Sequence, residues 1–220
     1  MAGKQIENPA SAVAQGMRRA GWLKTLLQWH WISSALCLVC IVLFSLTGIT
    51  LNHAGQIESK PTVHSRKAQA PAPVQAELRR FGAGRDGVKA PLTPLAARWA
   101  AATWSIGSAA QDAEWSADDV YLALPRPGGD AWLRIALADG AAEYEVTDRG
   151  WVSWLNDLHK GRNAGPAWGW FIDLLAVACL VFAVTGFLIL KMHAHNRPFT
   201  WPMVGLGLVL PAVLALLFVH

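Results

Sequence analysis

The sequence predicts a mainly α-helical membrane protein with three transmembrane helices, two of which form an inverted repeat, and a small α+β module between the first two helices. Three observations support this fold class. Of the 220 residues, 53% are hydrophobic and only 15% are charged, whereas soluble proteins average about 25% charged residues. Three apolar runs are long enough to cross a bilayer, and a long segment of ordinary polarity separates the first two. The net charge of +4 is small, with no basic clusters interleaved with aromatic residues, so nucleic-acid binding is not expected.

The apolar runs cover residues 32–51, 168–190 and 201–219. About 20 residues of helix span a hydrocarbon core of about 30 Å. Backbone groups find no partners in lipid, so all three runs should be helical. The second run contains one charged residue, Asp173, and Pro211 predicts a kink in the third. Tryptophans favour the headgroup zone of a bilayer, and they gather at the ends of the runs: Trp22, Trp29, Trp31, Trp151, Trp154, Trp168, Trp170 and Trp201.

Basic residues predict the orientation, because short cytoplasmic segments are enriched in lysine and arginine. The N-terminal arm has four basic residues and one acidic residue. The short connector between the second and third apolar runs, residues 191–200, has two basic residues and no acidic residue. We therefore expect a cytoplasmic N-terminus and a periplasmic segment over residues 54–165. The first apolar run should be an uncleaved anchor and not a signal peptide. The predicted divisions are a cytoplasmic arm (1–28), helix 1 (29–53), a periplasmic tether (54–91), the α+β module (92–150), an interfacial segment with helix 2 (151–192), a cytoplasmic connector (193–200) and helix 3 (201–220).

The polar segment divides into two parts by composition. Residues 54–91 are rich in Ala, Pro, Gly and charge, which favours a mobile tether. The stretch "PLTPLAARWAAATW" predicts a helix with Thr93 as N-cap and Pro94 at its first position. The stretches "VYLALP", "AWLRIAL" and "AEYEVTD" alternate as half-buried strands do. One helix and three strands make a marginal domain, so it should lean on the membrane surface or on a partner.

The three cysteines, Cys37, Cys40 and Cys179, all lie inside apolar runs. Cys37 and Cys40 form a CxxC pair, which is also the spacing of redox and metal-binding pairs. Inside a membrane helix a cysteine more often serves as a small apolar residue, and this is the interpretation that we favour.

A short motif occurs in both of the first two apolar runs. "LFSLTGITLNH" (43–53) and "VFAVTGFLILKMH" (181–193) each contain Phe, then Thr-Gly three residues later, then a histidine. The pairs Thr47–Gly48 and Thr185–Gly186 lie towards the ends of helices that should run in opposite directions, which predicts an inverted repeat. Glycine permits close helix contact and threonine bonds backbone groups, so helix packing alone also explains the motif.

Six of the seven histidines lie close to a predicted membrane boundary: His30, His53, His159, His193, His195 and His220. Antiparallel packing of the repeated helices should place His30 near His193 and His195, and His53 near His159 and His220. Paired imidazoles in an apolar helix bundle suit bis-histidine haem b, so we expect two haem sites. Alternatively, the histidines only anchor the helix ends at the interface. Zinc is less suitable, since the thiolates lie in mid-membrane.

Several assignments stay open at this point. His193 lies on nearly the same helix face as Gly186 and is preferred to His195, while His159 and His220 compete for one ligand position. Lys160 and Arg162 flank His159 and suit an anionic substrate or lipid phosphates. Asp173 should support a histidine N–H or relay a proton. No nucleophile–base set appears, so no catalytic residues are predicted.

These features resemble the PepSY-associated transmembrane helix family. The resemblance is carried by "HWISSALCLVCIVLFSLTGITLNH", the module at 92–150, "WLNDLHKGRNAGPAWGWFIDLLAVACLVFAVTGFLIL" and "RPFTWPMVGLGLVLPAVLALLFVH". Its most specific parts are the LHxG element (158–161) and the two TG-containing runs. Larger members resemble ferric-siderophore reductases of the bacterial inner membrane, with haem held by histidines. Small members are thought to work beside TonB-dependent uptake and periplasmic electron-transfer proteins.

The resemblance implies an inner-membrane haem-b protein that passes electrons outward to ferric siderophores or to a periplasmic redox partner in iron uptake. This chain has three predicted helices, one PepSY-like half and no nucleotide or flavin fingerprint. A ferric reductase built on it would therefore need a partner or a homo-oligomer. The alternative is a non-redox membrane adaptor whose PepSY-like module binds a periplasmic partner, and a third reading is a subunit of a metal or siderophore importer.

Overall fold

The computed structural model describes residues 9–57, 60–107 and 111–219. This part of the chain divides into two compact units, which we describe separately. One unit comprises residues 1–43 and 171–220, and the other comprises residues 44–170. Two long helices, α1 and α5, each begin in one unit and end in the other.

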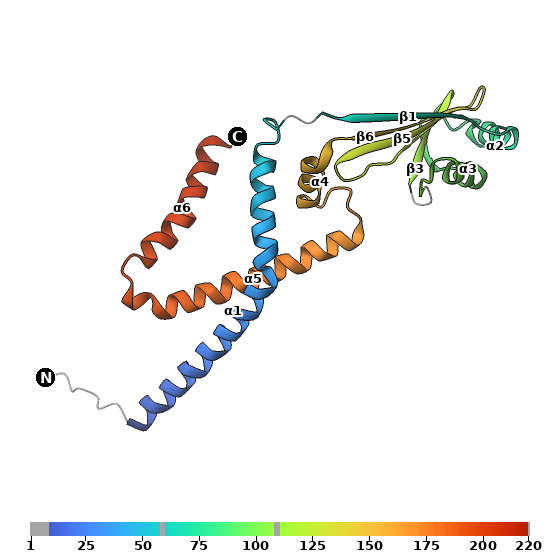
Figure 1. The fold of residues 1–220 in the computed structure, drawn as a ribbon. Coiled ribbons are helices and arrows are strands. Elements are labelled where there is room, and N and C mark those ends of the chain that lie inside the picture. The colour runs from blue at the N-terminus through green and yellow to red at the C-terminus, as the bar shows by residue number, and fades with distance from the viewer. Residues whose placement is uncertain (1–8, 58–59, 108–110, 220) are drawn as a thin grey trace. The chain divides into compact units, whose positions relative to one another are not determined.

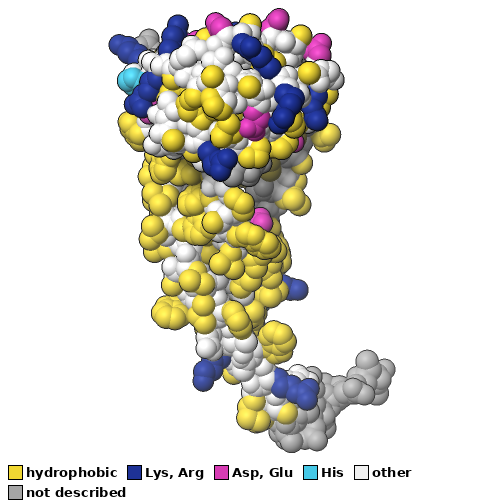
Figure 2. Space-filling model, turned by 90° about the vertical axis from the view of Figure 1, so that its right-hand side faces the viewer, with side chains coloured by type: hydrophobic (Ala, Val, Ile, Leu, Met, Phe, Trp, Pro, Cys, Tyr) yellow, Lys and Arg dark blue, Asp and Glu magenta, His cyan; other side chains and the backbone are white. Residues whose placement is uncertain are grey.

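The first unit is built from the long apolar helices (Figure 1). Helix α1 (Pro9–Asn52), helix α5 (Pro166–His193) and helix α6 (Thr200–Phe218) are all long and apolar enough to cross a membrane, and a 3₁₀ turn (Ala194–Asn196) separates the last two. Only 11%, 6% and 0% of their most apolar windows are buried inside the protein, and Figure 2 shows hydrophobic side chains spread over the helix surfaces. The prediction of three transmembrane helices is confirmed, and a lipid bilayer is the environment that suits them.

Helix α1 is longer than its apolar run. It begins at Pro9 and continues for 44 residues without interruption, about 66 Å at 1.5 Å per residue. The N-terminal arm is therefore helical from Pro9 onward and continuous with the membrane-spanning part. Several apolar side chains in this extension are exposed, among them Met17 and Trp22.

The second unit contains a six-stranded antiparallel sheet with the strand order β1-β6-β5-β4-β3-β2. The sequence analysis predicted only the last three of its six strands. The strands are β1 (Thr62–Gln69), β2 (Val88–Pro91), β3 (Asp112–Trp115), β4 (Asp119–Ala123), β5 (Gly129–Ala136) and β6 (Ala141–Asp148). Helices α2 (Ala72–Gly82) and α3 (Pro94–Trp104) pack on one face of the sheet, and α4 (Gly150–His159) follows β6.

Alternation along the strands separates a buried face from an exposed one. In β5, Leu133 and Ile135 are fully buried, whereas the side chain of Arg134 is exposed. The buried face packs against Leu78 of α2 and Ala100 of α3, which together form the core of the unit. Burying apolar area of this kind contributes about 25 cal/mol per Å², so this core stabilises the sheet.

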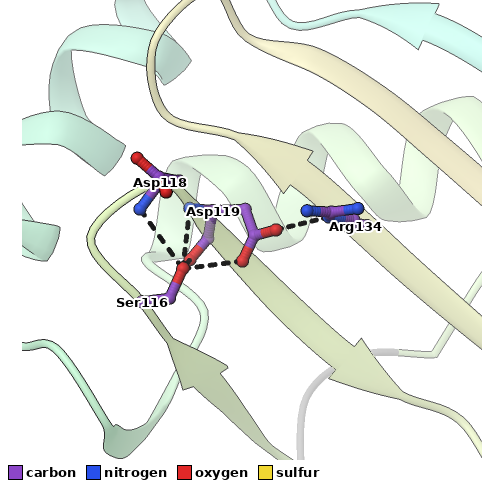
Figure 3. A network of polar contacts seen from close by, with 4 residues as sticks. All are labelled: Ser116, Asp118, Asp119 and Arg134. Carbon is purple, nitrogen blue, oxygen red and sulfur yellow. Dashed lines mark hydrogen bonds and ion pairs between the residues drawn. The ribbon is translucent and has the colours of Figure 1, made fainter.

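Polar contacts on the exposed side fix the turn between β3 and β4 (Figure 3). The Ser116 hydroxyl accepts the backbone N–H groups of Asp118 and Asp119 at 3.2 and 2.9 Å, and it donates to the Asp119 carboxylate at 2.8 Å. The second carboxylate oxygen of Asp119 pairs with Arg134 on β5. The network therefore closes a tight turn and ties two neighbouring strands together.

Residues 54–91 were predicted to form a mobile tether, but this segment contains β1, α2 and β2 and belongs to the sheet unit, so that prediction is wrong. Strand β1 lacks apolar alternation since it lies at the sheet edge with nearly every side chain exposed. Helix α2 has a polar composition, but Val74, Leu78 and Gly82 follow one another at four-residue intervals and face the core.

The helix predicted to begin at Thr93 is present as α3, with Pro94 in its first turn. However, the Thr93 side chain makes no capping hydrogen bond. Its hydroxyl is buried, with no hydrogen-bond partner among the residues that the structure describes.

Candidate functional site

His30 on α1 packs against the Phe-x-x-Thr-Gly motif of α5. Its ring stacks on Phe182, with centroids 4.6 Å apart and planes inclined by 13°. Its Nδ1 lies 3.1 Å from the Thr185 hydroxyl and 3.2 Å from the Phe182 carbonyl oxygen. At Gly186, an added Cβ would lie only 3.0 Å from the His30 Cε1. The Phe, Thr and Gly of the motif therefore all contact the same imidazole ring.

These contacts determine which ring nitrogen of His30 carries the proton. A carbonyl oxygen only accepts hydrogen bonds, and the Thr185 hydroxyl uses its own proton to donate to the Val181 carbonyl at 2.7 Å. The His30 Nδ1 must therefore be the protonated donor. In the neutral ring the lone pair then resides on Nε2, which is the form that binds metal ions.

A second histidine lies beside this site. His30 and His193 line a cavity of about 240 Å³ together with Gly186, Ile189, Leu190, Arg197 and Thr200. The His193 Nδ1 donates to the carbonyl of Ile189, one turn earlier, at 2.8 Å. His193 thus has the same protonated Nδ1 as His30. His193 and His195 are both exposed, but His195 lies in the 3₁₀ turn and does not line this cavity.

His159 on α4 makes the corresponding contacts in the other unit, with the motif at the end of α1. Its Nδ1 lies 2.7 Å from the Thr47 hydroxyl, and its ring centroid lies 4.9 Å from that of Phe44. An added Cβ at Gly48 would lie 3.6 Å from the His159 Cε1. The Thr47 hydroxyl also reaches the Phe44 carbonyl within its own helix, at 3.2 Å.

Helix α4 is fixed by two buried polar residues that precede His159. The Thr50 hydroxyl donates to the Asn156 Oδ1 at 2.8 Å. The Asp157 carboxylate accepts the Gly128 N–H at 2.9 Å and pairs with Arg162 at 2.8 Å. Gly128 has φ +74°, and an added Cβ would lie 2.7 Å from the Trp154 Cβ, so only glycine fits there. The turn before β5 is thereby docked on the helix that presents His159.

The remaining predicted site residues are exposed or lie outside the described part. His53 is exposed, and its Nδ1 lies 3.1 Å from the Gln56 side chain. Arg162 is bound to Asp157, whereas Lys160 is exposed. Asp173 is exposed on α5. His220 lies outside the described residues.

Sequence reasoning missed the roles of four residues: Phe44, Phe182, Asn156 and Asp157. The two phenylalanines were visible as part of the repeated motif, but nothing in one sequence assigned a histidine to each. Asn156 and Asp157 form a polar pair just before His159. Two adjacent polar residues on a helix that also carries Leu155 and Leu158 are the signal that would have drawn attention to them.

The donor set can be compared with the needs of haem. No group of three or more His, Cys, Asp or Glu side chains that would hold a bare metal ion occurs among the residues described here. Haem iron takes only two axial ligands from the protein. His30 and His193 have the right chemistry for two axial ligands. The Nδ1 of each ring is hydrogen-bonded to a carbonyl oxygen, and both residues line one cavity. The cavity is smaller than the roughly 300–1,000 Å³ of ligand sites, so its lining must move apart to admit a macrocycle.

A family model described as "Putative PepSY_TM-like" matches residues 21–220 of this chain. No curated protein matches it. No solved structure matches it either.

Proposed function

This chain belongs to the PepSY_TM-like family, and we propose that it is a haem-b electron-transfer protein of the bacterial inner membrane. In this proposal it passes electrons outward to ferric chelates or to a periplasmic redox partner in iron uptake. The N-terminus is then cytoplasmic and the sheet module is periplasmic, in accordance with the basic residues of the N-terminal arm.

The observation that carries the proposal is the tautomer imposed on His30. A metal-binding histidine usually donates its second ring N–H to a carbonyl, carboxylate or hydroxyl, which fixes its orientation and raises its basicity. His30 donates to Phe182 and Thr185, and His193 donates to Ile189. Both rings therefore keep Nε2 available as an axial ligand.

The residues around His30 have distinct tasks in this scheme. Thr185 and the Phe182 carbonyl hold the proton on Nδ1, and the Phe182 ring fixes the plane of the imidazole. Ile189 and Leu190 exclude water, and Arg197 supplies a cation to the cavity wall. Bound haem b would supply one-electron chemistry. His159, whose Nδ1 is hydrogen-bonded to Thr47, is the proposed ligand of a second haem, with His53, His220 or a second copy of the chain as the opposite ligand.

An absorption spectrum of the full chain, purified in detergent from haem-replete cells, tests the proposal. We expect a Soret band that sharpens on reduction with dithionite, and a haem-to-protein ratio of at least about one per chain. His30→Ala and His193→Ala should each remove the haem of this site, while His195→Ala, a matched control, should retain it. A colourless preparation, or equal haem retention in all three variants, would refute the proposal.

A non-redox membrane adaptor is the second candidate, and one observation favours it. The His30–Thr185 and His159–Thr47 hydrogen bonds each join two helices, as a purely structural clamp would. In that case the protein is colourless, and the histidine variants lose stability without any change in the absorption spectrum.

A further inference from the structure

Strand β1 is a long unpaired sheet edge. It contains eight residues, of which seven have exposed side chains, and among the residues that the structure describes it pairs on one side only, with β6. The pairing is regular, running from Thr62 opposite Asp148 to Gln69 opposite Ala141 without a bulge. A regular, exposed edge is a ready template for a further strand.

The register shows which backbone groups of β1 are free. Just beyond the strand, the Ala70 N–H donates to the Gly140 carbonyl at 2.9 Å, and residues 70 and 140 continue the same register. Hydrogen-bonded and non-hydrogen-bonded pairs alternate in an antiparallel ladder. The even-numbered residues of β1 therefore bond β6, and Val63, Ser65, Lys67 and Gln69 direct their N–H and C=O groups outward.

The opposite edge of the sheet differs from β1. Strand β2 has four residues and ends at Pro91. A short strand that ends in proline is one of the usual means of preventing strand addition. The two edges of one sheet are therefore unequal, and only β1 offers a full row of donors and acceptors.

The charge of β1 selects the kind of strand that fits. His64, Arg66 and Lys67 are basic, and the strand has no acidic residue. Lys67 lies 3.8 Å from Glu143, but the two side chains are 78% and 36% exposed, so this pair neutralises little. An antiparallel pair of two β1 strands must set outward-facing residues opposite outward-facing residues. The two registers of greatest overlap then place Arg66 directly opposite or diagonal to Arg66 of the second copy, and like charges across strands are destabilising.

We propose that β1 is a docking site for an extended acidic segment of a partner protein, which adds to the sheet as a seventh strand. The outward backbone groups of Val63, Ser65, Lys67 and Gln69 supply main-chain hydrogen bonds, and the basic side chains select acidic residues. A second copy of this chain is disfavoured by its own charge. This inference concerns the sheet unit alone and does not depend on haem binding.

Fluorescence anisotropy with a labelled peptide tests the charge preference. The probe is a synthetic peptide with the length of β1 and alternating Glu and Val, and its counterpart has Lys in place of Glu. We expect the full chain in detergent to bind the Glu peptide and not the Lys peptide, with affinity falling as salt rises. Arg66→Glu combined with Lys67→Glu should reverse the preference. Equal binding of both peptides, or binding of neither, would overturn the proposal.

Two variants at one position test the backbone requirement. Ser65→Pro removes an outward N–H without touching the ladder to β6, whereas Ser65→Ala retains that N–H. Both lose the hydroxyl that donates to Glu143, so they are matched. We expect Ser65→Pro to weaken Glu-peptide binding about tenfold or more, as loss of a hydrogen bond and the added ring imply, and Ser65→Ala to bind normally. Equal affinities would place the peptide elsewhere.

Hydrogen exchange of the unmodified chain gives the same information without a variant. Bound Glu peptide should slow exchange at the amides of residues 63, 65, 67 and 69. The amides of residues 64, 66 and 68 should change little, because β6 already protects them. Absence of this alternation on peptide binding would refute strand addition, and self-association of the free chain through the same amides would show that a second copy is the occupant.

Discussion

The Thr47 hydroxyl is hydrogen-bonded to the Nδ1 of His159 at 2.7 Å, and the Thr185 hydroxyl makes the same contact with the Nδ1 of His30 at 3.1 Å. Each threonine stands in a Phe-x-x-Thr-Gly motif, and each motif holds a histidine that belongs to a different helix. The sequence repeat is therefore also a repeat of contacts. At His30 the Phe182 carbonyl beside Nδ1 requires the proton on that nitrogen, which leaves Nε2 as the reactive nitrogen.

Removal of the Thr47 hydroxyl should destabilise the His159 contact. Thr47→Val keeps the shape of the side chain but leaves the partly buried Nδ1 of His159 without its hydrogen-bond partner, which costs about 1–3 kcal/mol. Thr47→Ser keeps the hydroxyl and should cost less. Unfolding of the detergent-solubilised chain measures the difference, and ¹⁵N shifts of the imidazole report the tautomer. Identical tautomer populations and equal stability in Thr47→Val and the unmodified protein would contradict a hydrogen bond between Thr47 and His159.

The two motif glycines should respond differently to alanine. At Gly186 the new Cβ meets His30 at 3.0 Å, which is tighter than ordinary contact, whereas at Gly48 it meets His159 at 3.6 Å. Gly186→Ala should therefore displace the His30 ring and cost about 1–3 kcal/mol, as overpacking does. Gly48→Ala should be neutral or slightly stabilising, since alanine favours helix by about 1 kcal/mol over glycine. Thermal unfolding of the two variants side by side checks the order, and a reversed order would show that the helices pack differently in the membrane.

The Asp157 carboxylate should matter far more than its neighbours on the surface. Its side chain is only 4% exposed, and it accepts the Gly128 N–H as well as pairing with Arg162. Asp157→Ala leaves that buried N–H unsatisfied, at a cost of about 1–3 kcal/mol. Asp130→Ala is the control, because the Asp130 side chain is 51% exposed in its pair with Arg149 and such pairs contribute about 1 kcal/mol or less. Limited proteolysis around residues 126–129 should accelerate in Asp157→Ala only. Equal acceleration in both variants would mean that Asp157 does not dock this turn.

The three membrane helices were predictable from the sequence because hydropathy over about 20 residues is a strong local signal. Strands β4, β5 and β6 were also predictable, since their alternation of apolar and polar residues is regular. Strand β1 was not, because an edge strand exposed on both faces carries no such alternation. The start of α1 at Pro9 was missed for a related reason, as residues 13–20 are exposed and the first turns are mixed in composition.

The candidate site was predictable in its residue types and only partly in its contacts. Spacing singled out the histidines and both Thr-Gly pairs, but it gave no means of knowing that His30 would contact Thr185 and His159 would contact Thr47. Such pairings are long-range contacts, separated by 155 and 112 residues. The buried carboxylate of Asp157 depends on Gly128, 29 residues away, and a single sequence does not reveal that partner.

The buried hydroxyl of Thr93 predicts a substitution that raises the free energy of unfolding. Thr93 is 4% exposed, stands at the N-cap of α3 and uses its backbone carbonyl to accept the Ala97 N–H at 2.9 Å, but its hydroxyl has no partner among the described residues. Burying an unbonded hydroxyl costs about 1–3 kcal/mol by mutational measures. Thr93→Val removes that cost at nearly constant volume and should raise the free energy of unfolding by about 1 kcal/mol. Thr103→Val, at an exposed position of the same helix, should stay within about 0.5 kcal/mol. Chemical denaturation of both variants decides the matter: a loss of stability in Thr93→Val would show that the hydroxyl binds a partner, such as an ordered water, when the protein folds in solution.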